Sequence, residues 1–151
     1  MAKASERTIG ELGARAVFIT SRRKWEHEPG SFQRTVLPHD RLDVYRAAVE
    51  FERSSRGILA LLPRSSHLAD QLHRAATSIP LNIAEGAGEF SPKDKARFYR
   101  IALRSATESA AILDLVGPDL GEDSGDMLAL RDSLVSIVAM LTKLVATQAN
   151  R

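Results

Sequence analysis

A regular spacing of apolar residues, which begins after Pro38, is the feature that most restricts the fold of this chain. Apolar or small residues recur there in steps of three and four, the spacing that places side chains on one face of an α-helix. The first such set is Val44, Ala48, Phe51, Ser55, Ile58 and Leu62. The last set is Met127, Leu130, Leu134, Ile137, Leu141 and Leu144. The regular part of the chain is therefore expected to consist of amphipathic helices.

Start and stop signals divide this part into four predicted helices. The first is expected from about 39 to 62, because Pro63 cannot continue it. The second begins after the capping serines Ser65 and Ser66, bends at Pro80 and ends near Gly86 and Gly88, whose glycines allow the chain to turn. Its core positions are Leu68, Leu72, Ala75, Ala76, Ile79 and Ile83.

The third predicted helix begins at Ser91-Pro92, where Ser91 is the N-cap and Pro92 the first helical residue, and Gly117-Pro118 is expected to stop it. One apolar line on it is Tyr99, Ala102, Ala106, Ala110 and Leu113, and beside it lie Phe98, Ile101, Ile112 and Leu115. The fourth helix is expected from about 126 to 149. Four helices joined by short turns predict an all-α, antiparallel up-down-up-down four-helix bundle.

Composition agrees with one helical domain and an irregular N-terminal arm. The chain has 151 residues, 44% of them hydrophobic and only 5% aromatic, and alanine and leucine dominate the apolar set. We expect the bundle to occupy residues 38–151 and a flexible arm to occupy 1–37. Seven basic and four acidic residues give the arm a charge of +3. Arg22-Arg23-Lys24-Trp25 is either a basic arm whose indole stacks on a base or a solvated linker upstream of the true domain start.

Several kinds of chemistry lack the residues they require. The chain has no cysteine, no Gly-x-Ser-x-Gly elbow and no Glu-x-x-His pair of the kind that binds metals in bundles. It also lacks an apolar segment long enough to cross a membrane or to act as a signal peptide. We therefore expect a cytoplasmic protein that is not an enzyme and that has no catalytic residue, metal or cofactor.

The second helix and the start of the third carry a distinctive motif. It is Arg74-Ala75-Ala76-Thr77-Ser78-Ile79-Pro80-Leu81-Asn82-Ile83-Ala84-Glu85-Gly86, followed by Phe98-Tyr99 and by Arg104-Ser105-Ala106-Thr107-Glu108. These residues resemble the four-helix-bundle family of proteins encoded in intervening sequences of bacterial 23S ribosomal RNA, the S23-like proteins. The resemblance covers about 42–144. Members often have Gly-Ser where this chain has Arg104-Ser105.

The resemblance implies a bundle that assembles as a homopentamer without enzymatic activity. A related branch, the accessory proteins of diversity-generating retroelements, forms a similar five-membered barrel and partners nucleic acid and a reverse transcriptase. The motif's polar positions in this chain are Arg74, Asn82, Glu85, Ser105 and Glu108. We interpret them as structural residues that fix the helix register. If Glu85 and Glu108 are buried, each needs a partner such as Arg74 or Asn82, because an unpaired buried carboxylate is costly.

The predicted third helix carries a row of basic residues. Lys93, Arg97, Arg100 and Arg104 follow one another in steps of 4, 3 and 4 and form a stripe about 16 Å long at 1.5 Å per residue. Arg46, Arg53 and Arg56 could extend it if the first and third helices share an outer surface. The stripe predicts contacts to RNA phosphates that do not depend on base sequence. The alternative is a protein–protein scaffold without nucleic-acid binding, in which the stripe is only a solvated helix face.

A second apolar line follows the fourth predicted helix at Leu128, Val135, Val138 and Val145. It makes this helix wider on its apolar side than one bundle interior requires. We interpret Leu128, Val135 and Val138 as part of an interface between subunits. Deeper burial of the helix within a single bundle is the alternative.

Overall fold

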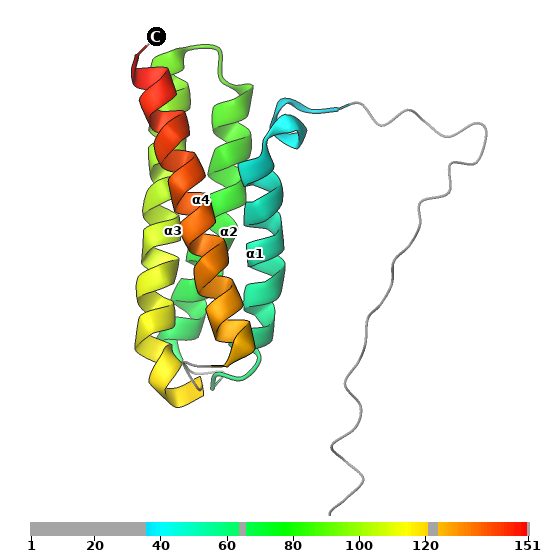
Figure 1. The fold of residues 1–151 in the computed structure, drawn as a ribbon, viewed down its shortest axis with the longest axis vertical. Helices are drawn as coiled ribbons and strands as arrows, with labels where there is room; N and C mark the ends of the chain where they lie inside the picture. Colours follow the sequence, from blue (N-terminus) through cyan, green and yellow to red (C-terminus); the bar gives the residue numbers. More distant parts are fainter. Residues whose placement is uncertain (1–35, 64–65, 121–123, 151) are drawn as a thin grey trace, which may run out of the picture. The chain divides into compact units, whose positions relative to one another are not determined.

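The computed structural model describes residues 36–63, 66–120 and 124–150, and the expected arm lies outside these ranges except for Val36 and Leu37. Figure 1 shows a short 3-10 turn followed by four helices. These elements are η1 (Pro38–Arg41), α1 (Asp43–Leu59), α2 (His67–Gly88), α3 (Pro92–Leu120) and α4 (Gly125–Ala149). None of the helices within the described ranges combines the length and apolar character needed to cross a membrane.

The four helices form an antiparallel up-down-up-down bundle, as predicted (Figure 1). The most extensive packing joins α2 to α3 and α3 to α4, and α1 packs on α2 and α4. Helices α1 and α3 consequently occupy diagonal positions, with α2 and α4 between them. This order of neighbours determines which outer surfaces can act together.

Serine hydroxyls cap three of the helices. The Oγ atoms of Ser66, Ser91 and Ser124 each accept a hydrogen bond from the backbone N–H group three residues later, at 3.4, 3.4 and 3.3 Å. Each bond satisfies a donor that has no partner within the first helical turn. The predicted starts of α2 and α3 are confirmed at these serines.

Three predicted boundaries are wrong. The expected first helix is interrupted at Leu42, whose extended backbone separates η1 from α1, and α1 ends at Leu59 rather than at Leu62. Helix α3 continues through Gly117-Pro118 to Leu120. A proline near the end of a helix removes only one hydrogen bond, to the carbonyl four residues earlier, so the final turn can still form.

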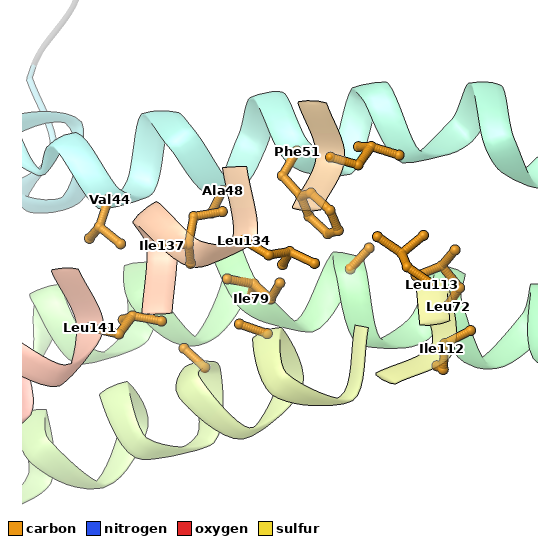
Figure 2. Close-up of a cluster of buried hydrophobic side chains, with 14 of the residues drawn as sticks. Val44, Ala48, Phe51, Leu72, Ile79, Ile112, Leu113, Leu134, Ile137 and Leu141 are labelled. Carbon is orange, nitrogen blue, oxygen red and sulfur yellow. The ribbon is translucent and has the colours of Figure 1, made fainter. Parts of the chain in front are cut away.

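The apolar stripes of all four helices meet in one core (Figure 2). Figure 2 shows Phe51 of α1, Ile79 of α2, Leu113 of α3 and Leu134 of α4 directed into the same interior. The expected core positions of α1 from Val44 to Ile58 are all buried. Leu115 is an exception, because its side chain is 63% exposed on the outer side of α3.

Gly86 has a different role from the turn-forming role expected of it. It lies inside α2, and neither Gly86 nor Gly88 adopts a left-handed backbone. A Cβ at Gly86 would lie 2.7 Å from Cε1 of Tyr99 and 3.2 Å from Cβ of Phe98. The missing side chain therefore allows α2 and α3 to approach each other closely around the buried Tyr99 ring.

Candidate nucleic-acid interface

Four basic residues of α3 form an exposed set on the outside of the bundle. We call this set the cation row: Lys93, Arg97, Arg100 and Arg104. None of the four forms an ion pair with another residue of the ranges 36–63, 66–120 and 124–150. The Arg97 guanidinium lies over the Phe98 ring, 5.1 Å from its centroid, which holds it near the surface of α3.

The cation row also borders a hollow at one end of the bundle. A shallow depression of about 390 Å³ lies between the start of α3 and the end of α4. Lys93 and Arg100 line it, together with Ser91, Gln148 and Ala149. Two side-chain cations thus face one open space that is wide enough for a phosphate group.

The arginines of α1 are arranged differently. Arg46 pairs with Asp43, and Arg53 approaches Glu50 at 4.0 Å. Arg56 donates two hydrogen bonds to the largely buried Glu52 carboxylate, from Nε at 3.0 Å and from Nη2 at 2.9 Å. Each of these arginines has a carboxylate partner on its own helix, which reduces the positive potential that it presents to a ligand.

The condition under which Arg46, Arg53 and Arg56 would extend the stripe, a shared outer surface of the first and third helices, is not met. Because α1 and α3 are diagonal in the bundle, their outer faces point in different directions. Arg46, Arg53 and Arg56 therefore do not continue the cation row. Two carboxylates lie closer to it along α3 itself, the half-buried Asp94 and the exposed Glu108.

The five polar motif residues divide into an exposed and a packed group. Arg74, Glu85 and Glu108 are exposed, and none of them forms a side-chain hydrogen bond or ion pair within the described part of the chain. The condition of burial under which Glu85 and Glu108 would need partners is therefore not met. Water solvates both carboxylates, so they do not hold the register of the bundle by pairing.

Asn82 and Ser105 belong to the packed group, and Ser78 joins them. The Ser105 hydroxyl donates to Ser78 Oγ at 2.9 Å across the α2–α3 boundary. Asn82 Nδ2 donates to the Ser78 carbonyl at 2.8 Å and to Ser78 Oγ at 3.0 Å. Ser78 was not among the predicted polar positions, although a serine four residues before Asn82 on a largely apolar helix was a usable signal.

Two further residues were missed. Glu52 is 9% exposed and lies between the core positions Phe51 and Ser55, and Arg56 four residues later indicated its partner. Phe90, in the link between α2 and α3, is 98% exposed. Its position directly before the Ser91 cap and three residues before Lys93 was visible in the sequence.

The expected interface residues on α4 also differ from one another. Leu128 is 49% and Val135 69% exposed, whereas Val138 is partly buried and packs against the core. The outer apolar line therefore consists mainly of Leu128 and Val135. Among residues 36–63, 66–120 and 124–150, no group of three or more His, Asp or Glu side chains could hold a metal ion.

The fold and the exposed row together define an all-α antiparallel bundle with an exposed basic surface on one helix. The family described as 23S rRNA-intervening sequence protein has a model that matches residues 40–143. The match covers most of the chain, from before α1 to well within α4, so the chain belongs to this family.

A solved structure shows the same fold. The chain is similar to a protein with unknown function from the S23 ribosomal protein family of Bacteroides thetaiotaomicron VPI-5482, whose crystal structure was determined at 1.70 Å resolution. The TM-score is 0.62 and the sequence identity 22%, over 68% of this chain and 97% of that chain. No curated protein matches this chain.

Proposed function

We propose that this protein is a non-enzymatic module that binds RNA through the phosphate backbone, with the cation row as its contact surface. The observation that carries the proposal is that all four cations are exposed and lack an ion-pair partner among the described residues. The charged side chains of α1 have such partners. An unpaired cation can replace a counterion at a phosphate without first giving up a carboxylate.

The length of the cation row fits several phosphates. Its four residues span about 16 Å, which is long enough for each cation to contact a different phosphate of one strand. Four phosphate contacts to a single strand give a slope of about −2.8 in the logarithm of affinity against the logarithm of salt concentration. Affinity is therefore expected to fall roughly 50-fold between 50 and 200 mM salt.

A filter-binding titration of the full chain against RNA at several salt concentrations tests this proposal. We expect Arg97→Glu with Arg100→Glu to lower the affinity at least about 10-fold and to halve the salt slope, because two of four contacts are lost. The matched control is Arg46→Glu with Arg53→Glu, which makes the same change in net charge on α1. The control is expected to bind within about threefold of the wild type.

Two results would contradict RNA binding by the cation row. Equal losses in the two double variants would mean that only net charge matters. No appreciable binding by the wild type at physiological salt would favour the alternative, a scaffold for a protein partner whose basic row only keeps the surface soluble.

We also propose that the bundle self-associates through the outer apolar line of α4. Leu128 and Val135 lie seven residues, or about two turns, apart on α4, and each is about half exposed or more. Burying them between subunits would remove apolar area from water, and each copy in an oligomer would present another cation row, which multiplies weak contacts.

Leu128→Asp or Val135→Asp tests self-association. Either substitution is expected to reduce the mass measured by sedimentation while the helical circular dichroism and the melting of the bundle persist, because the replaced side chain lies outside the core. Thr142→Asp, on an exposed position of the same helix, is the control and should leave the mass unchanged. An unaltered mass in both test variants would remove this face from the interface.

A further inference from the structure

Phe90 is the most exposed of the large apolar side chains in the described residues. It is 98% exposed, against 69% for Val135 and 66% for Leu61. Single exposed apolar residues are common on protein surfaces, but a phenyl ring with almost no contact to its own fold contributes nothing to the core. Its presence at this position is explained either by a contact within the helix cap or by a ligand.

Phe90 does not make the apolar contact that often accompanies a helix N-cap. Phe90 directly precedes the Ser91 N-cap, the position from which an apolar side chain commonly packs on the fourth residue of the helix. That residue is Lys95, whose ammonium group donates to the Ala87 carbonyl at 3.3 Å. The ring therefore has no apolar partner at the start of α3.

The position of Phe90 relative to the cation row points to a ligand. Three peptide units separate it from Lys93, so their Cα atoms lie at most about 11 Å apart. Glu89 and Asp94 flank the ring along the chain and make this end unfavourable for another phosphate. A group that contacts this ring should therefore be uncharged and flat, and it should be joined to a chain of phosphates. A nucleobase of RNA has these properties.

We propose that Phe90 stacks on an unpaired nucleobase of the RNA strand whose phosphates lie along the cation row. This inference rests on the RNA binding proposed above and adds the kind of RNA. Within a duplex both faces of a base are covered by its neighbours, so only a single-stranded segment or a frayed end can offer a face to the ring. The partner is therefore RNA with unpaired nucleotides at the Phe90 end of the row.

Two strands of equal length distinguish stacking from phosphate binding. One is a uridine strand of about ten nucleotides, within the range of single-strand site sizes, and the other is the same ribose-phosphate chain without bases. The wild type is expected to bind the uridine strand about 5-fold to 100-fold more tightly than the abasic strand. Phe90→Ala should bind both strands equally, at the wild-type affinity for the abasic one.

Two further variants separate the aromatic face from bulk and fold. Phe90→Tyr keeps the aromatic ring and should retain the preference for uridine, whereas Phe90→Leu keeps an apolar side chain and should lose it. Because the ring makes almost no contact with its own bundle, all three variants are expected to melt like the wild type.

The outcomes separate this inference from the proposed function. If both strands bind with a salt-sensitive affinity that Phe90→Ala leaves unchanged, RNA binding stands and stacking is wrong. If the wild type binds neither strand, RNA binding itself fails, and the stacking inference fails with it. A lower sedimentation mass for Phe90→Ala would show that the ring packs on another copy of the chain, which also overturns stacking.

Discussion

The α2–α3 pair and the α1–α4 pair pack their helices in different ways. Between α2 and α3, Gly86 lies against the Tyr99 ring and the Ser105 hydroxyl bonds to Ser78. Between α1 and α4, a groove of about 630 Å³ remains open, lined by Gly57 and Ala129 among others. A Cβ at Gly57 would meet nothing within 4 Å. Amphipathic helices of one bundle can thus pack closely on one side and leave space on another.

Among the substitutions that compare the two helix pairs, Gly86→Ala is expected to change the free energy of unfolding the most. The added methyl group would lie 2.7 Å from a carbon of Tyr99, and that ring is only 4% exposed. Because the ring cannot move into solvent, the helices must separate, at a cost of about 1–3 kcal/mol in the free energy of unfolding. Urea denaturation measures this loss. A variant as stable as the wild type would show that the α2–α3 contact adapts without strain.

Gly57→Ala is the matched substitution on the open side, and its effect should be smaller and opposite in sign. Gly57 lies within α1, where alanine is favoured over glycine by about 0.5–1 kcal/mol, and the new methyl group enters empty space. The free energy of unfolding is therefore expected to rise. Destabilisation by Gly57→Ala would mean that the groove closes on the helix in solution.

The smallest effect expected is a change in stability at alkaline pH caused by Tyr99. Burial raises the pKa of its phenol above the ordinary value of 10.0. The unfolded chain therefore loses this proton first as pH rises. The stabilisation that the buried phenol provides is fully present below pH 10 and is lost as pH approaches the folded-state pKa.

Tyr99→Phe tests this contribution, because a phenyl ring has no proton to lose. The wild type should lose more stability than Tyr99→Phe between pH 9 and pH 11, as measured by urea denaturation at fixed ionic strength. Parallel decreases in the two proteins would show that Tyr99 ionises equally easily in the folded and unfolded chains.

The helices and most core residues were predictable because their signals are local. Ser66 and Ser91 mark helix starts through hydroxyls that reach N–H groups three residues later, and the spacing from Met127 to Leu141 identified the buried side of α4. Leu115 was assigned to the wrong side because α3 has two apolar lines, and spacing alone does not say where the buried face ends. The end of α3 was predicted too early because a proline such as Pro118 disrupts the interior of a helix but can be accommodated in its last turn.

The candidate site was predictable only in part. Steps of three and four placed the cation row on one face of α3. The pairing of Arg56 with Glu52 also had a local signal, because the two residues are four positions apart on one helix. The exposure of Glu85 and Glu108 depended on how α2 and α3 are rotated against each other. Spacing within each helix does not determine that rotation.

The helix starts, the apolar faces and the basic residues of α3 were predictable from local residue patterns, because these properties depend on side chains within a turn or two of one another. The diagonal positions of α1 and α3, the fit of the Tyr99 ring against Gly86 and the near absence of contacts around Phe90 emerged only when the helices were packed together. Such facts depend on which helices are neighbours and how closely they approach. A one-dimensional pattern carries the period of a helix but not the identity of the surface that it meets.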